Sequence, residues 1–187
     1  PLMLTSDDGN DSKELIIKNY PGEKTVLSSG IVLDLKWEKY KNGIMRAVVK
    51  GSPVMDMLFV NGELKSMARY PNYDEKAVRF NGTSALATAP ERVKKWKCPE
   101  GGYLHAMHKH DWGDFHYRIT GKNEKGELQL EGGWQNNRPM GIHPENRMVE
   151  NIFEELDAPG EWYYDKQEGW LYYYPLSDEN INELVFE

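Results

Sequence analysis

Short aromatic-rich segments separated by glycine and proline are the sequence feature that most restricts how this chain can fold. Its 187 residues include six Trp, eleven Tyr and five Phe, with 17 Gly and 10 Pro spread among them. Aromatic and β-branched residues favour strands, whereas Gly and Pro favour the turns between strands. The pattern therefore predicts an all-β protein, either a β-sandwich or a barrel-like domain, with one or two short helices.

Two hairpins are the most strongly indicated elements. Residues 57–60 and 63–64 flank Asn61-Gly62, a pair that supplies the two positive-φ residues of a type I′ turn. Residues 161–165 and 170–174 are rich in Trp and Tyr and are separated by a polar turn. We expect the aromatic side chains of this second hairpin to pair across its strands.

Two other segments predict short helices. Thr88-Ala89-Pro90-Glu91 has the form of a capping box, so a helix is expected to begin there and to end near Trp96. Between Met148 and Leu156 the apolar residues recur at helical spacing. This spacing predicts a second short helix that covers the sheet.

Residues 1–33 differ in texture from the rest of the chain. Their apolar stretches are short and are separated by polar turns, which is typical of β-solenoid coils. Such coils do not bury their apolar faces alone, and exposed strand edges invite pairing with another chain. We therefore expect self-association through residues 1–30. Because the chain starts at Pro1 rather than Met, we also expect it to be a processed or excised piece of a longer one.

Charge and cysteine content exclude several classes of protein. The chain has 23 Lys+Arg against 30 Asp+Glu, and a net charge of −7 argues against a nucleic-acid partner because such proteins bind phosphates through cations. Its single cysteine, Cys98, excludes a disulfide framework. The apolar runs are much shorter than the roughly 20 residues of a membrane helix, so no membrane span is predicted. No signal-peptide pattern is present at the N-terminus.

The densest group of reactive side chains lies in residues 101–116. On a strand, His108 and His110 share a face, and His116 or a nearby aspartate completes a three-ligand set of the kind a catalytic zinc uses. A hydrogen-bonded loop with stacked aromatic rings is an alternative. A third interpretation makes His108, His110 and Trp112 ligand contacts with no metal bound.

A second polar segment, residues 132–141, holds amides, a guanidinium and an indole between glycines. Trp134, Asn136 and Arg138 suit a sugar, which offers both hydroxyl groups and an apolar C–H face. The alternative is a loop whose amides satisfy its own backbone.

Catalytic motifs are not evident. Carboxylates are paired at Glu154-Glu155 with Asp157 and at Asp111 with Asp114, but glycoside hydrolysis needs a defined separation across a cleft, which the sequence does not show. Nucleophile-elbow, phosphate-loop and dinucleotide motifs are absent from the sequence. Cys98 lies between Lys97 and Pro99 with no defined base to activate it. We assign no catalytic residue and no cofactor.

Several motifs occur together in a fixed order. They are Tyr20-Pro21-Gly22-Glu23-Lys24, Leu58-Phe59-Val60-Asn61-Gly62-Glu63, Ala68-Arg69-Tyr70-Pro71-Asn72, Glu155-Leu156-Asp157-Ala158-Pro159-Gly160-Glu161-Trp162-Tyr163 and Gly169-Trp170-Leu171-Tyr172-Tyr173-Tyr174-Pro175. The series resembles one region of right-handed parallel β-helix enzymes similar to glycoside hydrolase family 141, which are secreted bacterial proteins, often from Bacteroidetes. The resemblance implies opening β-helix coils in residues 1–33, a β-rich insertion domain in 34–175 and a return strand in 176–187.

The function implied by this resemblance is that of a non-catalytic insertion domain of a secreted, polysaccharide-degrading glycoside hydrolase. Such a domain shapes the substrate cleft and contacts polysaccharide or oligosaccharide, and the family's catalytic carboxylates are expected beyond Glu187. Its other expected partner is the remainder of the parent β-helix, and its expected location is the periplasm, the cell surface or the outside of a bacterium. The alternatives are a free-standing carbohydrate-binding module and a small metal-dependent enzyme that uses the histidine-rich loop.

Overall fold

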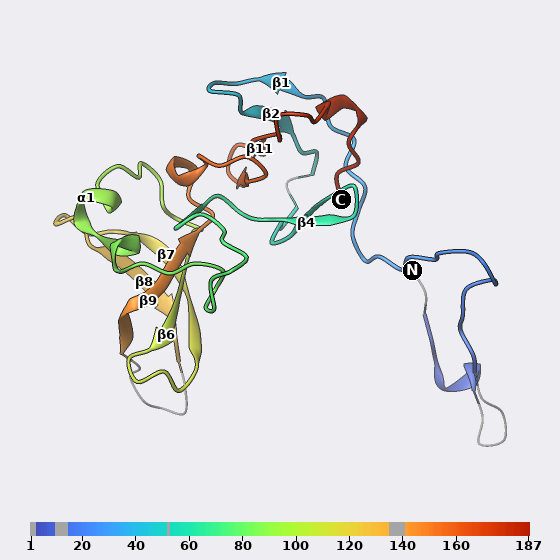
Figure 1. Cartoon of the computed structure of the whole chain (residues 1–187), viewed down its shortest axis with the longest axis horizontal. Helices are drawn as coiled ribbons and strands as arrows, with labels where there is room; N and C mark the ends of the chain where they lie inside the picture. The colour runs from blue at the N-terminus through green and yellow to red at the C-terminus, as the bar shows by residue number, and fades with distance from the viewer. Residues whose placement is uncertain (1–2, 10–14, 52, 135–140) are drawn as a thin grey trace. The chain divides into compact units, whose positions relative to one another are not determined.

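The computed structural model describes residues 3–9, 15–51, 53–134 and 141–187. The chain divides into two compact units, Pro1–Val32 and Leu33–Glu187, which are considered separately. Three antiparallel sheets and a few short helices confirm the predicted all-β class (Figure 1). In the described part of the chain, no helix is long and apolar enough to cross a membrane.

The described residues of the first unit form one 3₁₀ turn, η1 (Ser6–Asp8), and no strand. Thr5 caps this turn, and its backbone N–H donates to Oδ2 of Asp8 at 2.6 Å. The short strands expected in this segment are absent from its described residues, because strands need ladder partners and no such partner is present there. The assignment of residues 1–33 to β-helix coils stays a prediction.

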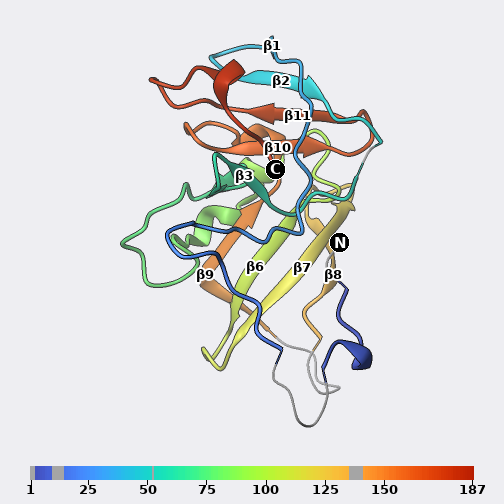
Figure 2. The same cartoon turned by 90° about the vertical axis from the view of Figure 1, so that its right-hand side faces the viewer.

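One sheet of the second unit has four strands in the order β1 (Glu38–Lys39), β2 (Met45–Val48), β11 (Trp170–Tyr173) and β10 (Trp162–Asp165) (Figure 2). Its β10–β11 hairpin confirms the second predicted hairpin. Trp162 lies opposite Tyr173, and both are fully buried in the core. On the other face, the rings of Tyr163 and Tyr172 lie 6.0 Å apart between centroids. The aromatic residues therefore pair across the strands on both faces.

The first predicted hairpin is also present, as β3 (Leu58–Val60) and β4 (Glu63–Lys65). Asn61 and Gly62 have φ values of 51° and 79°, as a type I′ turn requires. The C-terminal segment follows the 3₁₀ helix η4 (Ile181–Glu183) and runs antiparallel to β3. Phe59 and Glu187 exchange backbone hydrogen bonds of 2.7 and 2.9 Å.

The third sheet has five antiparallel strands. Their order is β5 (Arg69–Tyr70), β9 (Ile142–Glu150), β6 (Tyr103–His108), β7 (Asp114–Lys122) and β8 (Leu128–Gly132). One face is apolar: Leu104, Ile119 and Val149 are buried there in one cluster with Val93 and Trp96. The 3₁₀ helix η2 (Ala85–Thr88) and the helix α1 (Pro90–Val93) cover this face (Figure 1).

The helix predictions need correction. The expected helix between Met148 and Leu156 is instead the end of β9, a positive-φ residue at Asn151 and the 3₁₀ turn η3 (Phe153–Glu155). Cross-strand pairing of β9 with β6 outweighs the local helical spacing. The helix expected from residue 88 begins at Pro90 and ends at Val93, and its N-cap makes no side-chain hydrogen bond.

Candidate functional site

Two connections of the five-stranded sheet lie at the same end of the sheet, because β6, β7, β8 and β9 alternate in direction. One is the turn between β6 and β7, which carries Trp112. The other is the connection from β8 to β9, in which Trp134 is the second residue. The indoles of Trp112 and Trp134 are 76% and 81% exposed, so the fold presents two large apolar side chains to solvent at this end.

The histidine-rich segment supports Trp112 rather than a metal. His108, the last residue of β6, is buried, and its ring stacks on Trp112 with centroids 5.3 Å apart and planes inclined by 23°. His108 Nδ1 accepts the backbone N–H of His110 at 3.1 Å. Burial lowers the pKa of His108, and the neighbouring His110 and Lys109 lower it further. The neutral imidazole ring therefore packs against one face of the Trp112 indole.

The metal interpretation requires His108 and His110 on one face of a strand, and the structure instead shows the alternative of a hydrogen-bonded turn with stacked aromatic rings. β6 ends at His108, so His110 lies in the turn, where Asp111 has a φ of 59°. His116 Nδ1 is hydrogen-bonded to Nδ1 of His105 instead. Among the described residues, no three His, Cys, Asp or Glu side chains form a group that could hold a metal ion. The geometry therefore gives no support to the metal-dependent alternative.

Of the second predicted sugar-binding segment, only Trp134 can be placed. Asn136 and Arg138 lie outside the described residues. Gly133 precedes Trp134 with a φ of 67°, and a Cβ at this position would lie 2.0 Å from the ring of Tyr117. Only glycine allows the chain to cross Tyr117 so closely before Trp134 turns outward.

A row of titratable side chains crosses the other face of the five-stranded sheet, opposite the apolar one. His105 Nε2 lies 2.7 Å from Oε1 of Glu150 and donates to it. His105 Nδ1 then accepts a hydrogen bond from the Nδ1–H of His116. His116 Nε2 lies 3.8 Å from Oδ2 of Asp114. These four residues form a polar chain from a solvent-exposed aspartate to Glu150.

A cavity of about 650 Å³ lies beside Glu150. Its walls include Arg69 and Glu161, which are 4% and 3% exposed, and the half-exposed ring of Tyr73. Arg69 donates to three backbone carbonyls at 2.7 to 3.0 Å. Burial lowers the pKa of Arg69, while Glu150 and Glu161 oppose this shift.

Glu161 is the most strongly perturbed carboxyl group in this part of the protein. Its Oε2 accepts the backbone N–H groups of Asp157 and Ala158 at 3.3 and 3.2 Å, which closes the turn before β10. Its Oε1 is buried without a hydrogen-bond partner among the described residues. Burial raises the pKa of Glu161 to about 8, although the two backbone hydrogen bonds lower it. The neutral acid therefore predominates at pH 7.

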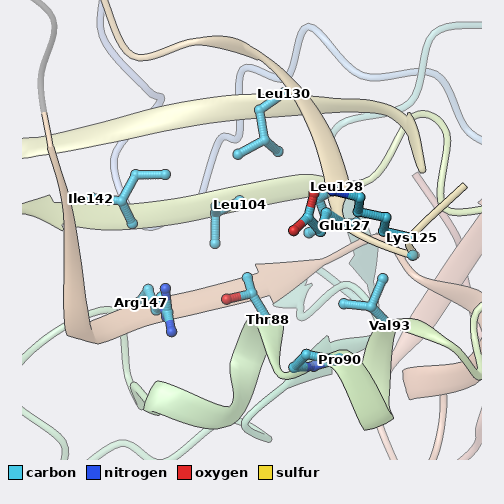
Figure 3. A pocket seen from close by; sticks show the side chains of 11 residues that line it. Thr88, Pro90, Val93, Leu104, Lys125, Glu127, Leu128, Leu130, Ile142 and Arg147 are labelled. Atoms are coloured by element: carbon cyan, nitrogen blue, oxygen red, sulfur yellow. The ribbon is translucent and has the colours of Figure 1, made fainter. Parts of the chain in front are cut away.

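A smaller cavity of about 290 Å³ lies on the apolar face of the five-stranded sheet, next to η2 and α1 (Figure 3). Leu104, Leu130 and Ile142 form much of its wall. Arg147 and Thr88 bring polar groups to one side. None of the described residues that line this cavity is aromatic, so it suits an aliphatic or flat apolar group better than a sugar.

The described residues thus form an all-β domain with exposed tryptophans at one end of a sheet and with cavities beside Glu161 and Arg147. No protein-family model matches the chain. No curated protein matches its sequence. A solved structure described as "Glycoside hydrolase" matches with a TM-score of 0.63 and 22% identity, over 88% of this chain and 32% of that one.

This likeness shows that the chain shares its fold with part of a glycoside hydrolase, and that it spans about a third of that protein's length. The more specific resemblance, to an insertion domain of a β-helix enzyme of family 141, goes beyond it and remains a proposal.

Proposed function

We propose that this chain is a non-catalytic domain of a polysaccharide-degrading glycoside hydrolase and that it contacts glycan through the end of the sheet that carries Trp112 and Trp134. The observation that carries the proposal is the stacking of the exposed Trp112 indole on the buried His108 ring. An indole held in one orientation offers apolar area to a sugar C–H face at little cost in side-chain entropy. The shared fold with a glycoside hydrolase supports the same class of ligand.

Within the parent enzyme, we place this domain as an insertion into a right-handed β-helix, where it shapes one side of the substrate cleft. The catalytic carboxylates then belong to other parts of the parent. The ordered motifs of the sequence support this placement, and secretion to the periplasm, cell surface or medium follows from it. Robust glycosidase turnover by the 187-residue chain, lost on mutation of one of its own carboxylates, would overturn the non-catalytic assignment.

The exposed apolar surface of the N-terminal unit suggests that another protein segment packs against residues 1–32. Large apolar side chains among its described residues are exposed, and they include Leu15, Ile16 and Ile17, which are 50%, 65% and 55% exposed. We propose that the remainder of the parent β-helix covers them. In the 187-residue chain we expect them to drive self-association, which light scattering measures. A monomer at high protein concentration would contradict this part of the proposal.

The glycan contact is tested by titrating a panel of plant and host polysaccharides against the wild-type chain and Trp112→Ala. We expect the substitution to weaken binding at least fivefold, which corresponds to about 1 kcal/mol. Tyr20→Ala is the control, because Tyr20 is equally exposed, at 75%, but lies in the other unit. A flat titration across the panel, or equal affinity of Trp112→Ala and wild type, would refute the contact.

The affinity of the chain alone also separates this proposal from a free-standing carbohydrate-binding module. Such a module holds its ligand by itself, whereas a cleft-shaping domain supplies only part of the contact surface. Tight binding by the 187-residue chain, comparable with that of the whole enzyme, favours the module.

A further inference from the structure

Arg147 stands at a position where the strand alternation calls for an apolar side chain. In β9, Val149 pairs with Leu104 and Arg147 pairs with Ala106. Leu104, Ala106 and Val149 all face the core cluster of this sheet. Since alternate residues of a strand share a face, Arg147 lies on the same apolar side. A guanidinium on such a face is costly unless it has polar partners.

The partners of Arg147 are incomplete. Its Nη2 donates to the backbone carbonyl of Ala85 at 2.9 Å. Its Nε is buried and has no hydrogen-bond partner among the described residues. Burial lowers the pKa of Arg147, and no carboxylate of the described residues opposes this shift. A partly buried cation with an unused donor and no counter-charge marks a place where an anion is stabilised.

The cavity beside Arg147 determines what kind of anion fits. Figure 3 shows the guanidinium on one side and Leu104, Leu130 and Ile142 around the adjoining space. Thr88 adds a hydroxyl, which points to the side of Arg147 (Figure 3). The remaining charged groups of the wall are Lys125 and Glu127, on the far side of the cavity from Arg147 (Figure 3).

The charge at the far side does not neutralise Arg147. The carboxylate of Glu127 accepts from Nδ2 of Asn123 at 2.7 Å, within its own turn. A bound anion would supply a negative charge on the side of the cavity where Arg147 lies. The volume of about 290 Å³ holds a molecule of about ten non-hydrogen atoms, at roughly 30 Å³ for each.

We propose that this cavity binds a small organic carboxylate, whose carboxyl group pairs with Arg147 and whose apolar body lies against the leucine and isoleucine side chains of the wall. The guanidinium donates to the carboxylate through its free N–H groups, and the Thr88 hydroxyl adds a further donor. Inorganic anions are poorer ligands, because they leave the apolar wall uncovered. This site is separate from the exposed tryptophans and does not depend on the glycan proposal.

The experiment uses hexanoate and benzoate as probes, with hexan-1-ol and benzyl alcohol as uncharged counterparts of the same size. Titration calorimetry on the 187-residue chain gives each affinity at pH 7. We expect at least one acid to bind, and to bind at least tenfold more tightly than its alcohol. The bound acid also raises the melting temperature, because it binds only the folded state.

Two variants and a control assign the site. Arg147→Met keeps an unbranched apolar side chain as long as the arginine stem but removes the guanidinium, and we expect it to bind acid and alcohol equally. Leu130→Trp fills the cavity and is expected to abolish binding of both, which keeps the test decisive if Arg147→Met fails to fold. Arg118→Met is the matched control, because Arg118 lies on the polar face in an exposed ion pair with Glu131. It should bind as wild type does.

Three outcomes overturn the proposal. The first is that neither acid binds the wild-type chain. The second is that acid and alcohol bind it equally, and the third is that Arg147→Met retains the preference for the acid. Glycan binding is measured on the same samples, so failure at this cavity is distinguishable from failure at Trp112.

Discussion

Replacing Glu161 with glutamine tests how burial controls its protonation. The side chain is 3% exposed, and its pKa is raised from the ordinary 4.5 to about 8. In the unfolded chain the carboxyl group ionises near its ordinary pKa, whereas the folded protein keeps the proton until about pH 8. The folded state thus binds more protons than the unfolded state within this window, so the free energy of unfolding falls as pH rises.

The expected slope follows directly from the proton difference. One proton corresponds to a loss of about 1.4 kcal/mol per pH unit between about pH 5.5 and 7.5, and the full shift amounts to about 5 kcal/mol. Glu161→Gln keeps an oxygen that accepts from Asp157 and Ala158 but cannot ionise, so this contribution disappears. Relative to wild type, the variant should gain about 3 kcal/mol between pH 5.5 and 7.5 and then level off above pH 8.

The assay is equilibrium unfolding in urea, followed by tryptophan fluorescence at pH 5.5, 6.5, 7.5 and 8.5. The quantity of interest is the difference in unfolding free energy between Glu161→Gln and wild type, because other titrating groups cancel in it. Glu168→Gln, at an exposed position in the β10–β11 turn, is the control and should show no such trend. A difference that stays constant within about 0.5 kcal/mol across this range would refute a neutral, buried Glu161.

Two further pairs of variants test the packing. Glu155→Ala removes a buried carboxylate that binds Arg92 at 2.6 Å and the indole N–H of Trp96 at 2.7 Å, and we expect it to lower the free energy of unfolding by about 3 kcal/mol. Its neighbour Glu154 makes one exposed hydrogen bond, so Glu154→Ala should lower the free energy of unfolding by less than about 1 kcal/mol. Leu58→Ala opens a cavity in the core and should lower the free energy of unfolding by about 2 to 5 kcal/mol. Leu64 lies in the paired strand with its side chain 61% exposed, so Leu64→Ala should lower it by less than about 1 kcal/mol. Urea unfolding measures both differences, and equal costs within a pair would contradict the assigned burial.

Local turn chemistry explains which parts of the fold were predictable. Asn61-Gly62 dictates its own turn, and the aromatic strands on either side of residues 166–169 leave little alternative to a hairpin. The order of strands in the five-stranded sheet carries no such local signal, because β9 pairs with β5 and β6 across distant parts of the sequence. Helical spacing near Met148 was misleading for the same reason, since the long-range ladder decided the conformation.

The candidate sites also differ in whether local sequence or long-range packing determines them. Trp112 was predicted as a ligand contact, and this stays a prediction; the structure shows an exposed indole that packs on the rings of His108 and His110. The burial of Glu161 and Arg147 depends on chain segments that meet only in the folded protein. A strand prediction for residues 142–150 would have exposed the anomaly at Arg147, because Val149 and Arg147 then share a face. The incorrect helix prediction concealed it.

Ile142 connects the two proposed ligand sites, yet the geometry argues that they act independently. Ile142 lines the cavity beside Arg147 and pairs with His108, whose ring supports Trp112. Coupling between sites requires an element with two arrangements that both ligands bias. His108 is instead fixed by the ladder, by its backbone hydrogen bond of 2.8 Å to Gly113 and by the contact of its Nδ1 with the turn. If both proposals hold, we therefore expect a carboxylate in the cavity to leave the indole of Trp112 in place, so that glycan affinity is the same with and without the acid.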